Sequence, residues 1–465
     1  MFKFTGEILS RVLTFVFYIY MARKLGVVDY GKYSFAYSFC SFFVVFFDLG
    51  LNTLFIRDVA ASKEKIKKYL ENITSIKLIL SVLTFFLISL VIRLLKYPDY
   101  VIQLVQLMAL VTIGTVFLDY TGAIFSSYEQ MQYESILKII IKFLISILGI
   151  YVLFIGYGLK QLIIVMFLCY VVTLIIGVYL IYTRITSFII KFDFKFWKST
   201  IFNSLPLALS GIFIVMYFRI DVILLSLIRG NSTEIGWYSA GMKIIDSIGV
   251  IPFLVMGGVF PVFSDLYKNN IDNLCKLYEK SFKYMCILGI GITFGGFLLS
   301  HQITDLLYGV QYKNTGIAFQ ILIVAVIFIF VDHLLLNILT AIEKQKLVAL
   351  CTGICVPVNI GLNLILIPHY GYIGSAIAIV STEIILFITT FYFVSKYLMK
   401  LQLFKIILKP LLSALFMVLI LYLLINRYNI FILIIFGMVT YFVSLYILKT
   451  FSVEEYKEIG QLVKI

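Results

Sequence analysis

The sequence predicts an all-α, polytopic membrane protein with about 14 transmembrane helices, and three observations carry that prediction. Of its 465 residues 62% are hydrophobic and 13% are charged, and the mean hydropathy of +1.06 lies outside the range of soluble domains. Apolar segments long enough to cross a bilayer recur along the chain. The alternation of period two that barrel strands need is absent, and the segment Ile73 to Leu95 is too long for a strand.

The apolar segments follow one another from the amino terminus with short connections. Their expected limits are 4–22, 33–56, 73–95, 101–124, 136–156, 161–183, 200–228, 239–263, 282–304, 316–342, 347–367, 373–395, 406–425 and 430–448. The first segment carries Glu7 and Arg11 and lacks a small-residue cleavage site after it. We therefore expect it to stay attached and not to be removed as a signal peptide.

The net charge of +14 follows mainly from the loops on one side of these segments. If the amino terminus is cytoplasmic, the cytoplasmic loops hold most of the Lys and Arg, so both termini are expected in the cytoplasm and the protein in the cell membrane. The basic cluster Ser62 to Tyr69 then sets topology, and we expect no nucleic-acid partner. No Gly-x-x-x-x-Gly-Lys-Ser/Thr loop is present, so transport would depend on gradients.

Two short motifs recur at matching places. Gly31-Lys32-Tyr33-Ser34 matches Gly236-Trp237-Tyr238-Ser239, and Tyr157-Gly158 matches Tyr370-Gly371. Two six-helix blocks related in this way predict a pseudo-twofold axis along the membrane normal, with a substrate path between the lobes. The expected divisions are an N-lobe (1–183), a cytoplasmic linker (184–199) suited to an interfacial helix, a C-lobe (200–397), and two further helices with the carboxyl terminus (398–465).

Four stretches carry a resemblance to a known family. They read ARKLGVVDYGKYSFAYSF, FFDLGLNTLFIRDVA, YFRIDVILLSLIRGNSTEIGWYSAGMKI and LNLILIPHYGYIGSAIAIVSTE. In order and spacing they resemble the Wzx-type flippases of polysaccharide repeat units, which belong to the multidrug, oligosaccharidyl-lipid and polysaccharide exporter superfamily. The resemblance covers the whole chain and implies two six-helix lobes that open alternately to each face.

The family's function gives the expected substrate and partners. The resemblance implies movement of a polyprenyl-diphosphate-linked oligosaccharide from the cytoplasmic to the outer leaflet, with membrane lipids and polysaccharide assembly proteins as further partners. The barrier to this movement is the loss of water around charged and hydroxyl groups, which a hydrated cleft lowers. No bond is made or broken, so we expect no enzymatic activity, no cofactor and no metal site beyond Na⁺ or H⁺ as a coupling ion.

Charged residues within the apolar segments are the candidate site. The cations expected to bind substrate are Arg219, Arg11, Lys142, Lys243 and Lys77. Arg219 is the strongest, because Asp221 lies on the nearly opposite helix face and is poorly placed to neutralise it. Alternatively, Arg11 pairs with Glu7, Lys243 pairs with Asp246, and the other two lysines extend to the interface.

Intramembrane acids are the candidates for coupling to H⁺ or Na⁺. They are Asp221, Asp48, Asp119, Asp332 and Glu383. The alternative for each is a hydrogen bond that fixes helix packing.

Three other functions stay open at this point. An exporter of small amphipathic cations, like the multidrug branch of the same superfamily, would need a predominantly acidic cavity. A membrane glycosyl polymerase or ligase would need catalytic residues in a large outer loop, and the outer loops here are short. A scaffold that transports nothing would have no use for the intramembrane charges.

Overall fold

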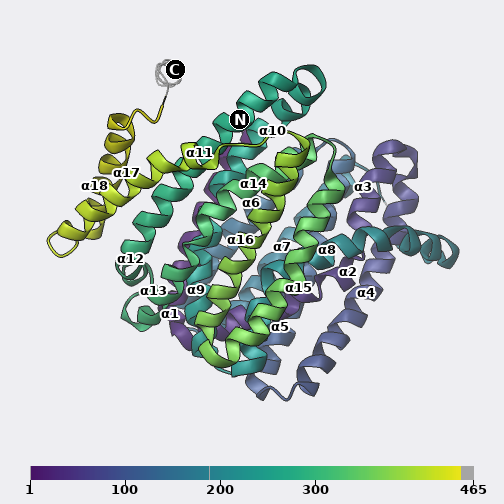
Figure 1. Cartoon of the computed structure of the whole chain (residues 1–465). Coiled ribbons are helices and arrows are strands. Elements are labelled where there is room, and N and C mark those ends of the chain that lie inside the picture. The colour runs from purple at the N-terminus through teal and green to yellow at the C-terminus, as the bar shows by residue number, and fades with distance from the viewer. Residues whose placement is uncertain (1, 188, 452–465) are drawn as a thin grey trace. The chain divides into compact units, whose positions relative to one another are not determined.

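The computed structural model describes residues 2–187 and 189–451, without the side chains of residues 2–9, 207 and 209–218 (Figure 1). Every regular element in these residues is a helix, which confirms the predicted all-α class. The α-helices are α1 (Phe2–Phe42), α2 (Val44–Asp48), α3 (Leu51–Ala61), α4 (Ile66–Leu94), α5 (Asp99–Ser127), α6 (Met131–Phe154), α7 (Leu159–Arg184), α8 (Phe194–Arg229), α9 (Ser232–Ile248), α10 (Val250–Asn269), α11 (Ile271–Leu298), α12 (Ser300–Tyr308), α13 (Lys313–Leu322), α14 (Ala325–Ala341), α15 (Gln345–Tyr370), α16 (Tyr372–Tyr397), α17 (Leu403–Leu424) and α18 (Ile430–Ile447).

Among the described residues, 10 helices are long and apolar enough to cross a membrane, or up to 12 if each bent pair of helices is one span. The structure departs most from the predicted segments at the first connection. The sequence suggested a loop between residues 22 and 33, but α1 continues through it and only Gly26 leaves the helical conformation (φ 76°, ψ 169°). Glycine adopts this backbone without a Cβ penalty, so a single residue provides the bend.

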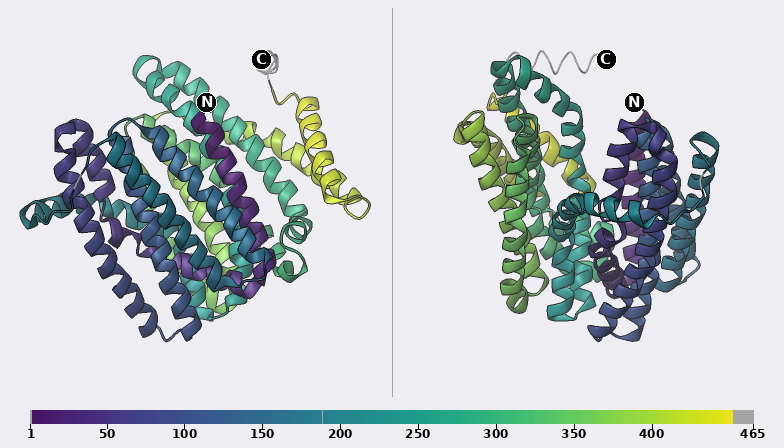
Figure 2. Two further views of the ribbon diagram at one scale, coloured as in Figure 1. Left: turned by 180° about the vertical axis from the view of Figure 1, so that it is seen from behind. Right: turned by 90° about the vertical axis from the view of Figure 1, so that its right-hand side faces the viewer.

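The chain forms two compact units, Met1–Ser239 and Ala240–Ile465. In the first unit α1 lies beside α5 and α6 (Figure 2), and α8 contacts α1 and α3. Its core includes Phe55 and Tyr120, whose rings meet edge to face at 5.6 Å. The compact unit therefore includes α8, whereas the sequence placed this segment in the C-lobe, and the lobe boundary at 184–199 stays a prediction.

The second unit is built around α11, α14, α15 and α16. The hairpin of α17 and α18, at the yellow end of the chain in Figure 1, is attached to α11. The Tyr441 hydroxyl donates to the Ile287 carbonyl oxygen at 2.8 Å, and a Cβ on Gly291 would lie 2.7 Å from the Tyr441 ring. The absence of a side chain at Gly291 thus lets the hairpin approach α11 closely.

The predicted linker 184–199 is helical only in part, because α8 already begins at Phe194, and its place at the membrane interface stays a prediction. Residues 186–187 and 189–193 have no helical structure, and they are attached to α4. The Asp193 backbone N–H donates to Asn72 Oδ1 at 3.0 Å, and Lys191 forms an ion pair with Glu71 at 2.9 Å. The Asp193 side chain then accepts from the Phe196 N–H at 3.0 Å and caps α8, which explains why the helix begins at Phe194.

The repeated glycine motifs meet at a close helix crossing within the first unit. A Cβ on Gly31 would overlap the Ser232 carbonyl oxygen, and a Cβ on Gly236 would overlap the Val27 carbonyl oxygen. Val27 and Ser232 are separated in the sequence by the same number of residues as Gly31 and Gly236. An exchange of the two repeats therefore turns the Gly31–Ser232 contact into the Gly236–Val27 contact. A pseudo-twofold relation between the repeats requires this reciprocity.

Candidate functional site

A buried ion pair joins α2 and α4 in the first unit. Lys77 is fully buried, and its ammonium pairs with Asp48 and lies 5.2 Å from the centre of the Tyr120 ring. A buried ammonium needs such a partner, because removal from water costs several kcal/mol. Lys77 therefore does not extend to the membrane interface, which was the alternative offered from the sequence.

Asp48 reaches this position because α2 ends there. Leu49 adopts a left-handed conformation (φ 46°), and so does Gly50 (φ 76°), after which α3 begins. Asp48 also accepts from the Asn52 backbone N–H at 3.3 Å. The break between two short helices thus turns a carboxylate towards the lysine of another helix.

The charged cluster continues on α5 and α6. Asp119 is exposed, and Lys77 and Lys138 are both near enough to stabilise its charge. Lys138 forms an ion pair with Glu134 at 2.6 Å, and Ser126 donates to the same carboxylate at 2.6 Å. Acidic and basic side chains from α2, α4, α5 and α6 therefore lie together, and their charges largely compensate one another.

Arg219 lies against a stack of tyrosines. Its guanidinium carbon is 5.0 Å from the centre of the Tyr37 ring, within the range of a cation–π interaction. Tyr37 stacks on Tyr33 at 6.3 Å, and the Tyr33 hydroxyl is 3.2 Å from that of Tyr18. Tyr33 and Tyr37 are one helical turn apart on α1, and the bend at Gly26 separates them from Tyr18.

Tyr170 on α7 connects the tyrosines with the charged cluster. It lies within electrostatic reach of Tyr37, Tyr18 and Asp119. A Cβ on Gly114 would lie 2.7 Å from the Tyr170 Cβ, so this glycine lets α5 and α7 approach closely. We call the connected set the polar row; it comprises Arg219, Tyr37, Tyr33, Tyr18, Tyr170, Asp119, Lys77 and Asp48.

Asp221 points away from the polar row, as the spacing of two residues from Arg219 predicted. It is 2% exposed and accepts a hydrogen bond from the Tyr238 hydroxyl at 3.2 Å. This bond joins α8 to the start of α9. The geometry favours the packing role for Asp221, and its coupling role stays a prediction.

The second unit holds a separate pair of buried carboxylates. Asp332 on α14 is 2% exposed and accepts from the Thr390 hydroxyl at 2.8 Å, while its other oxygen, Oδ2, has no hydrogen-bond partner. Glu383 on α16 is also buried and close enough to repel a charge on Asp332. Asn359 and Asn363 are buried on the adjacent α15. A buried carboxylate oxygen without a donor is a position where a proton or a cation would lower the energy.

Three of the predicted cations remain. Arg11 on α1 and Lys142 on α6 are half-buried and engaged in interactions in the first unit. The predicted pairing of Arg11 with Glu7 falls on a side chain outside the described residues. Lys243 is half-buried in the second unit, and Asp246 is exposed. Among the described residues no group of three or more His, Cys, Asp or Glu side chains could hold a metal ion.

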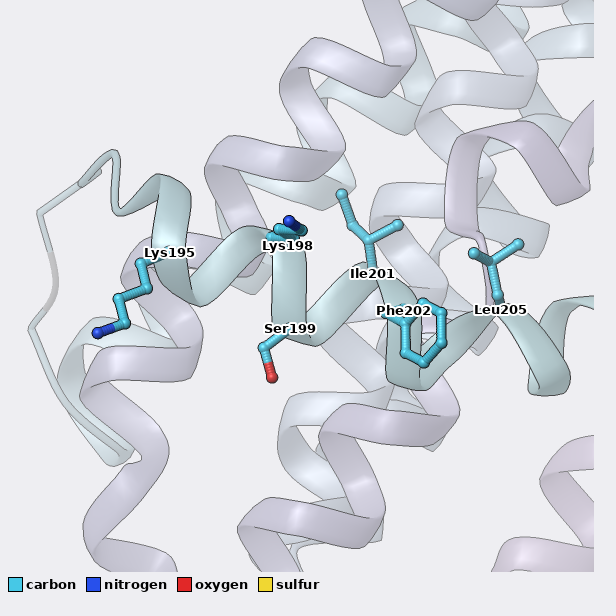
Figure 3. Close-up of a pocket in the computed structure, with 6 residues that line it drawn as sticks. All are labelled: Lys195, Lys198, Ser199, Ile201, Phe202 and Leu205. Atoms are coloured by element: carbon cyan, nitrogen blue, oxygen red, sulfur yellow. The ribbon is translucent and has the colours of Figure 1, made fainter.

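A hollow of about 620 Å³ lies on the surface of α8 (Figure 3). Its lining residues are Lys195, Lys198, Ser199, Ile201, Phe202 and Leu205. One helix supplies the whole lining, and most of these side chains are exposed. An exposed apolar helix face is the ordinary surface of a membrane protein, so we assign no site here.

Comparison with known proteins places the chain among membrane transporters. The model of a family described as "Polysaccharide biosynthesis protein" matches residues 1–267, and that of the MatE family matches residues 206–365. A putative O-antigen transporter of Shigella flexneri is 24% identical, covering 77% of this chain and 88% of that protein. An uncharacterised membrane protein of Methanocaldococcus jannaschii is 22% identical, covering 84% of this chain and 82% of that protein.

Solved structures share the fold. The structure of the lipid II flippase MurJ in an inward closed conformation has a TM-score of 0.79 at 18% identity, covering 96% of this chain and 98% of that chain. An inward-facing multidrug resistance transporter of the MATE family has a TM-score of 0.63 at 14% identity, covering 83% of this chain and 93% of that chain. At these identities the likeness concerns the fold alone.

Proposed function

Because the chain belongs to the polysaccharide biosynthesis protein family of the exporter superfamily, we propose that this membrane transporter flips a lipid-linked saccharide from the cytoplasmic to the outer leaflet. The polar row is the observation that carries the proposal. It joins a guanidinium, several tyrosines and a compensated charge cluster within helices that are otherwise apolar. The proposal places both termini in the cytoplasm and the protein in the cell membrane.

The polar row matches the chemistry of such a headgroup. Arg219 is half-buried at one end of the row, and a guanidinium binds phosphate oxygens through paired hydrogen bonds. Tyrosine rings and hydroxyls offer the mixed apolar and polar contacts that a sugar needs. Lys77 has its charge compensated by Asp48, so it contributes to the polarity of the row and Arg219 carries the phosphate contact.

The buried acids of the second unit are the proposed coupling site. Two carboxylates close together in a low-dielectric interior cannot both remain ionised without a compensating charge. Asp332 and Glu383 would therefore bind a proton or Na⁺ in one conformation and release it in the other. The unsatisfied Asp332 Oδ2 supports this role, because it is the position that the ion would occupy.

Export of small amphipathic cations is the second candidate. It is supported by the match of the MatE model and by the acidic members of the charged cluster. Lys77 and Lys138 pair with two of the three acids and leave a surplus of at most one negative charge, which argues against it, because a cation exporter of this kind would need a predominantly acidic cavity.

A transport assay with purified protein distinguishes the candidates. Proteoliposomes would contain a polyprenyl-diphosphate-linked oligosaccharide with a fluorescent sugar, and translocation would be read by enzymatic access to the sugar from outside. We expect protein-dependent movement of the lipid-linked saccharide and none of a lipophilic cation dye. Movement of the dye alone, or no movement of lipid-linked saccharides of varied sugar composition, would contradict the proposal.

A further inference from the structure

The first unit also holds a small hollow, and none of the residues that line it belongs to the polar row. It has a volume of about 290 Å³ and is formed by three segments: the second half of α1, the turn from α4 into α5, and the turn from α8 into α9. The sequence places all three at the outer side of the membrane. The residues that matter for its chemistry are Lys32, Phe35, Tyr97, Tyr100, Ser226 and Gly230.

Aromatic rings form one wall of the hollow. Phe35 and Tyr97 stack with their centres 4.8 Å apart, and the Tyr97 hydroxyl lies 2.7 Å from the Ser226 hydroxyl. Burial raises the pKa of Tyr97, so this hydroxyl stays protonated near neutral pH and remains a donor. Tyr100 is 40% exposed and not enclosed by the packing. The wall is therefore rigid at Tyr97 and accessible at Tyr100.

The charges beside the hollow compensate each other. Lys32 forms an ion pair with Asp29 at 2.9 Å, and its ammonium lies 5.0 Å from the centre of the Tyr100 ring. The pair offers hydrogen-bond donors and acceptors but little net charge. A phosphate would have to compete with Asp29 for the ammonium, whereas a neutral hydroxyl can bond to both groups.

The hollow is also open at one side. Gly230 has a left-handed backbone (φ 62°), and a Cβ placed there would meet no atom within 4 Å. A small-molecule site has a volume of roughly 300 to 1,000 Å³, so this hollow is at the lower limit. It has room for one sugar ring and not for an oligosaccharide.

From these features we propose that the hollow binds a single neutral sugar ring. The apolar C–H face of the ring packs on Tyr100, and its hydroxyls bond to Lys32 and Ser226 in the lining and reach Asp29, the ion-pair partner of Lys32. This inference rests on the proposed function, because it makes the hollow an outer contact for the saccharide that the protein has moved. It would hold one sugar at the outer surface while the phosphate is still inside.

The test uses the full-length protein in lipid nanodiscs and free sugars. Saturation-transfer NMR would measure binding of methyl glucoside, methyl galactoside and N-acetylglucosamine, with phosphocholine as the probe for a lipid headgroup. Loss of one aromatic contact in Tyr100→Leu should weaken sugar binding by roughly three- to tenfold. Gly230→Asn should abolish it, because Gly230 lines the hollow, and Asn tolerates the left-handed backbone while adding a side chain at this wall.

Tyr157→Leu is the matched control. Tyr157 is an exposed tyrosine, 54% accessible, on the turn between α6 and α7 outside the hollow. We expect it to bind sugar like the wild type. If Tyr100→Leu does not fold, as judged by size-exclusion chromatography, Gly230→Asn decides alone.

Each outcome separates this inference from the proposed function. Unchanged sugar binding in the folded Gly230→Asn variant, no sugar binding by the wild type, or displacement of the sugar by phosphocholine would overturn the sugar site. If one of these results is found but the wild type still flips lipid-linked saccharide, the proposed function is retained and only the sugar site is rejected. A wild type that binds the sugars in the hollow but flips none of the lipid-linked substrates would contradict the proposed function alone.

Discussion

Removal of Asp48 tests whether the buried ion pair is organised as the structure indicates. Lys77 is fully buried, whereas the side chain of Asp48 is 21% exposed, so the lysine depends on the aspartate more than the reverse. In Asp48→Asn the ammonium would keep a weak amide contact and the Tyr120 ring but lose its compensating charge. Breaking a buried pair by removal of one partner costs about 3 to 5 kcal/mol.

The loss of stability is expected to lie at the lower limit of this range. Asp119 is also near Lys77 and supplies part of the lost compensation. We therefore expect Asp48→Asn to lower the free energy of unfolding by about 3 kcal/mol, the lower limit for a buried pair. The double variant Asp48→Asn, Lys77→Met should recover most of this loss, because an apolar side chain of similar length fills the site without a charge.

Thermal and denaturant unfolding of the purified protein in detergent would measure both variants. Lys63→Met is a control, because Lys63 is exposed and its contact with Glu129 spans 3.9 Å at the surface. The reasoning is refuted if Asp48→Asn is as stable as the wild type, or if the double variant is less stable than the single one. Either result would mean that Lys77 does not depend on Asp48 for its charge.

Three further predictions concern the polar row, the buried acids and the glycine crossing. Arg219→Ala should reduce flipping of a lipid-linked saccharide in proteoliposomes by at least about tenfold, the effect of losing a charge-assisted hydrogen bond. The control is Arg229→Ala, on the same helix but paired with Glu234 near the surface, which should flip normally. If Arg219→Ala flips as fast as this control, Arg219 does not belong to the site. Asp332→Asn should abolish the dependence of the transport rate on an imposed pH or Na⁺ gradient. If the rate of this variant still responds to the gradient, the coupling ion binds elsewhere. Gly31→Val should prevent the close crossing, because a Cβ would overlap the Ser232 carbonyl oxygen. Cross-linking of cysteines placed at residues 27 and 232 would then be lost. Efficient cross-linking in this variant would show that the crossing needs no glycine.

The sequence predicted those features of the site that depend on local helix geometry. The opposite directions of Arg219 and Asp221 follow from a rotation of 100° per residue. The shared face of Tyr33 and Tyr37 follows in the same way from their spacing, although the sequence drew attention to Tyr33 only through the repeated motif. Helical periodicity and hydropathy also located the helices, because both are properties of neighbouring residues.

The features that it missed depend on contacts between distant segments. The pairing of Lys77 with Asp48 requires the break at Leu49 and Gly50, where two left-handed residues follow one another. Tyr18 reaches Tyr33 only because α1 bends at Gly26 instead of forming a loop. These bends depend on one or two residues within helical segments, and the periodicity of the neighbouring residues does not give their exact position or direction. The positions of glycines in otherwise regular apolar segments were the available clue.

The crossing of Gly31 and Gly236 has a consequence for the energy of the transport cycle. Backbone carbonyls face glycine positions there, and no large side chain is inserted between the two chain segments. The two glycines themselves bury no side chain, so their own contribution to the apolar burial at this crossing is small. The junction also leaves no bulky group that must change rotamer on closing. If the proposed function holds, these glycine contacts themselves would not resist release and re-formation of the junction during transport.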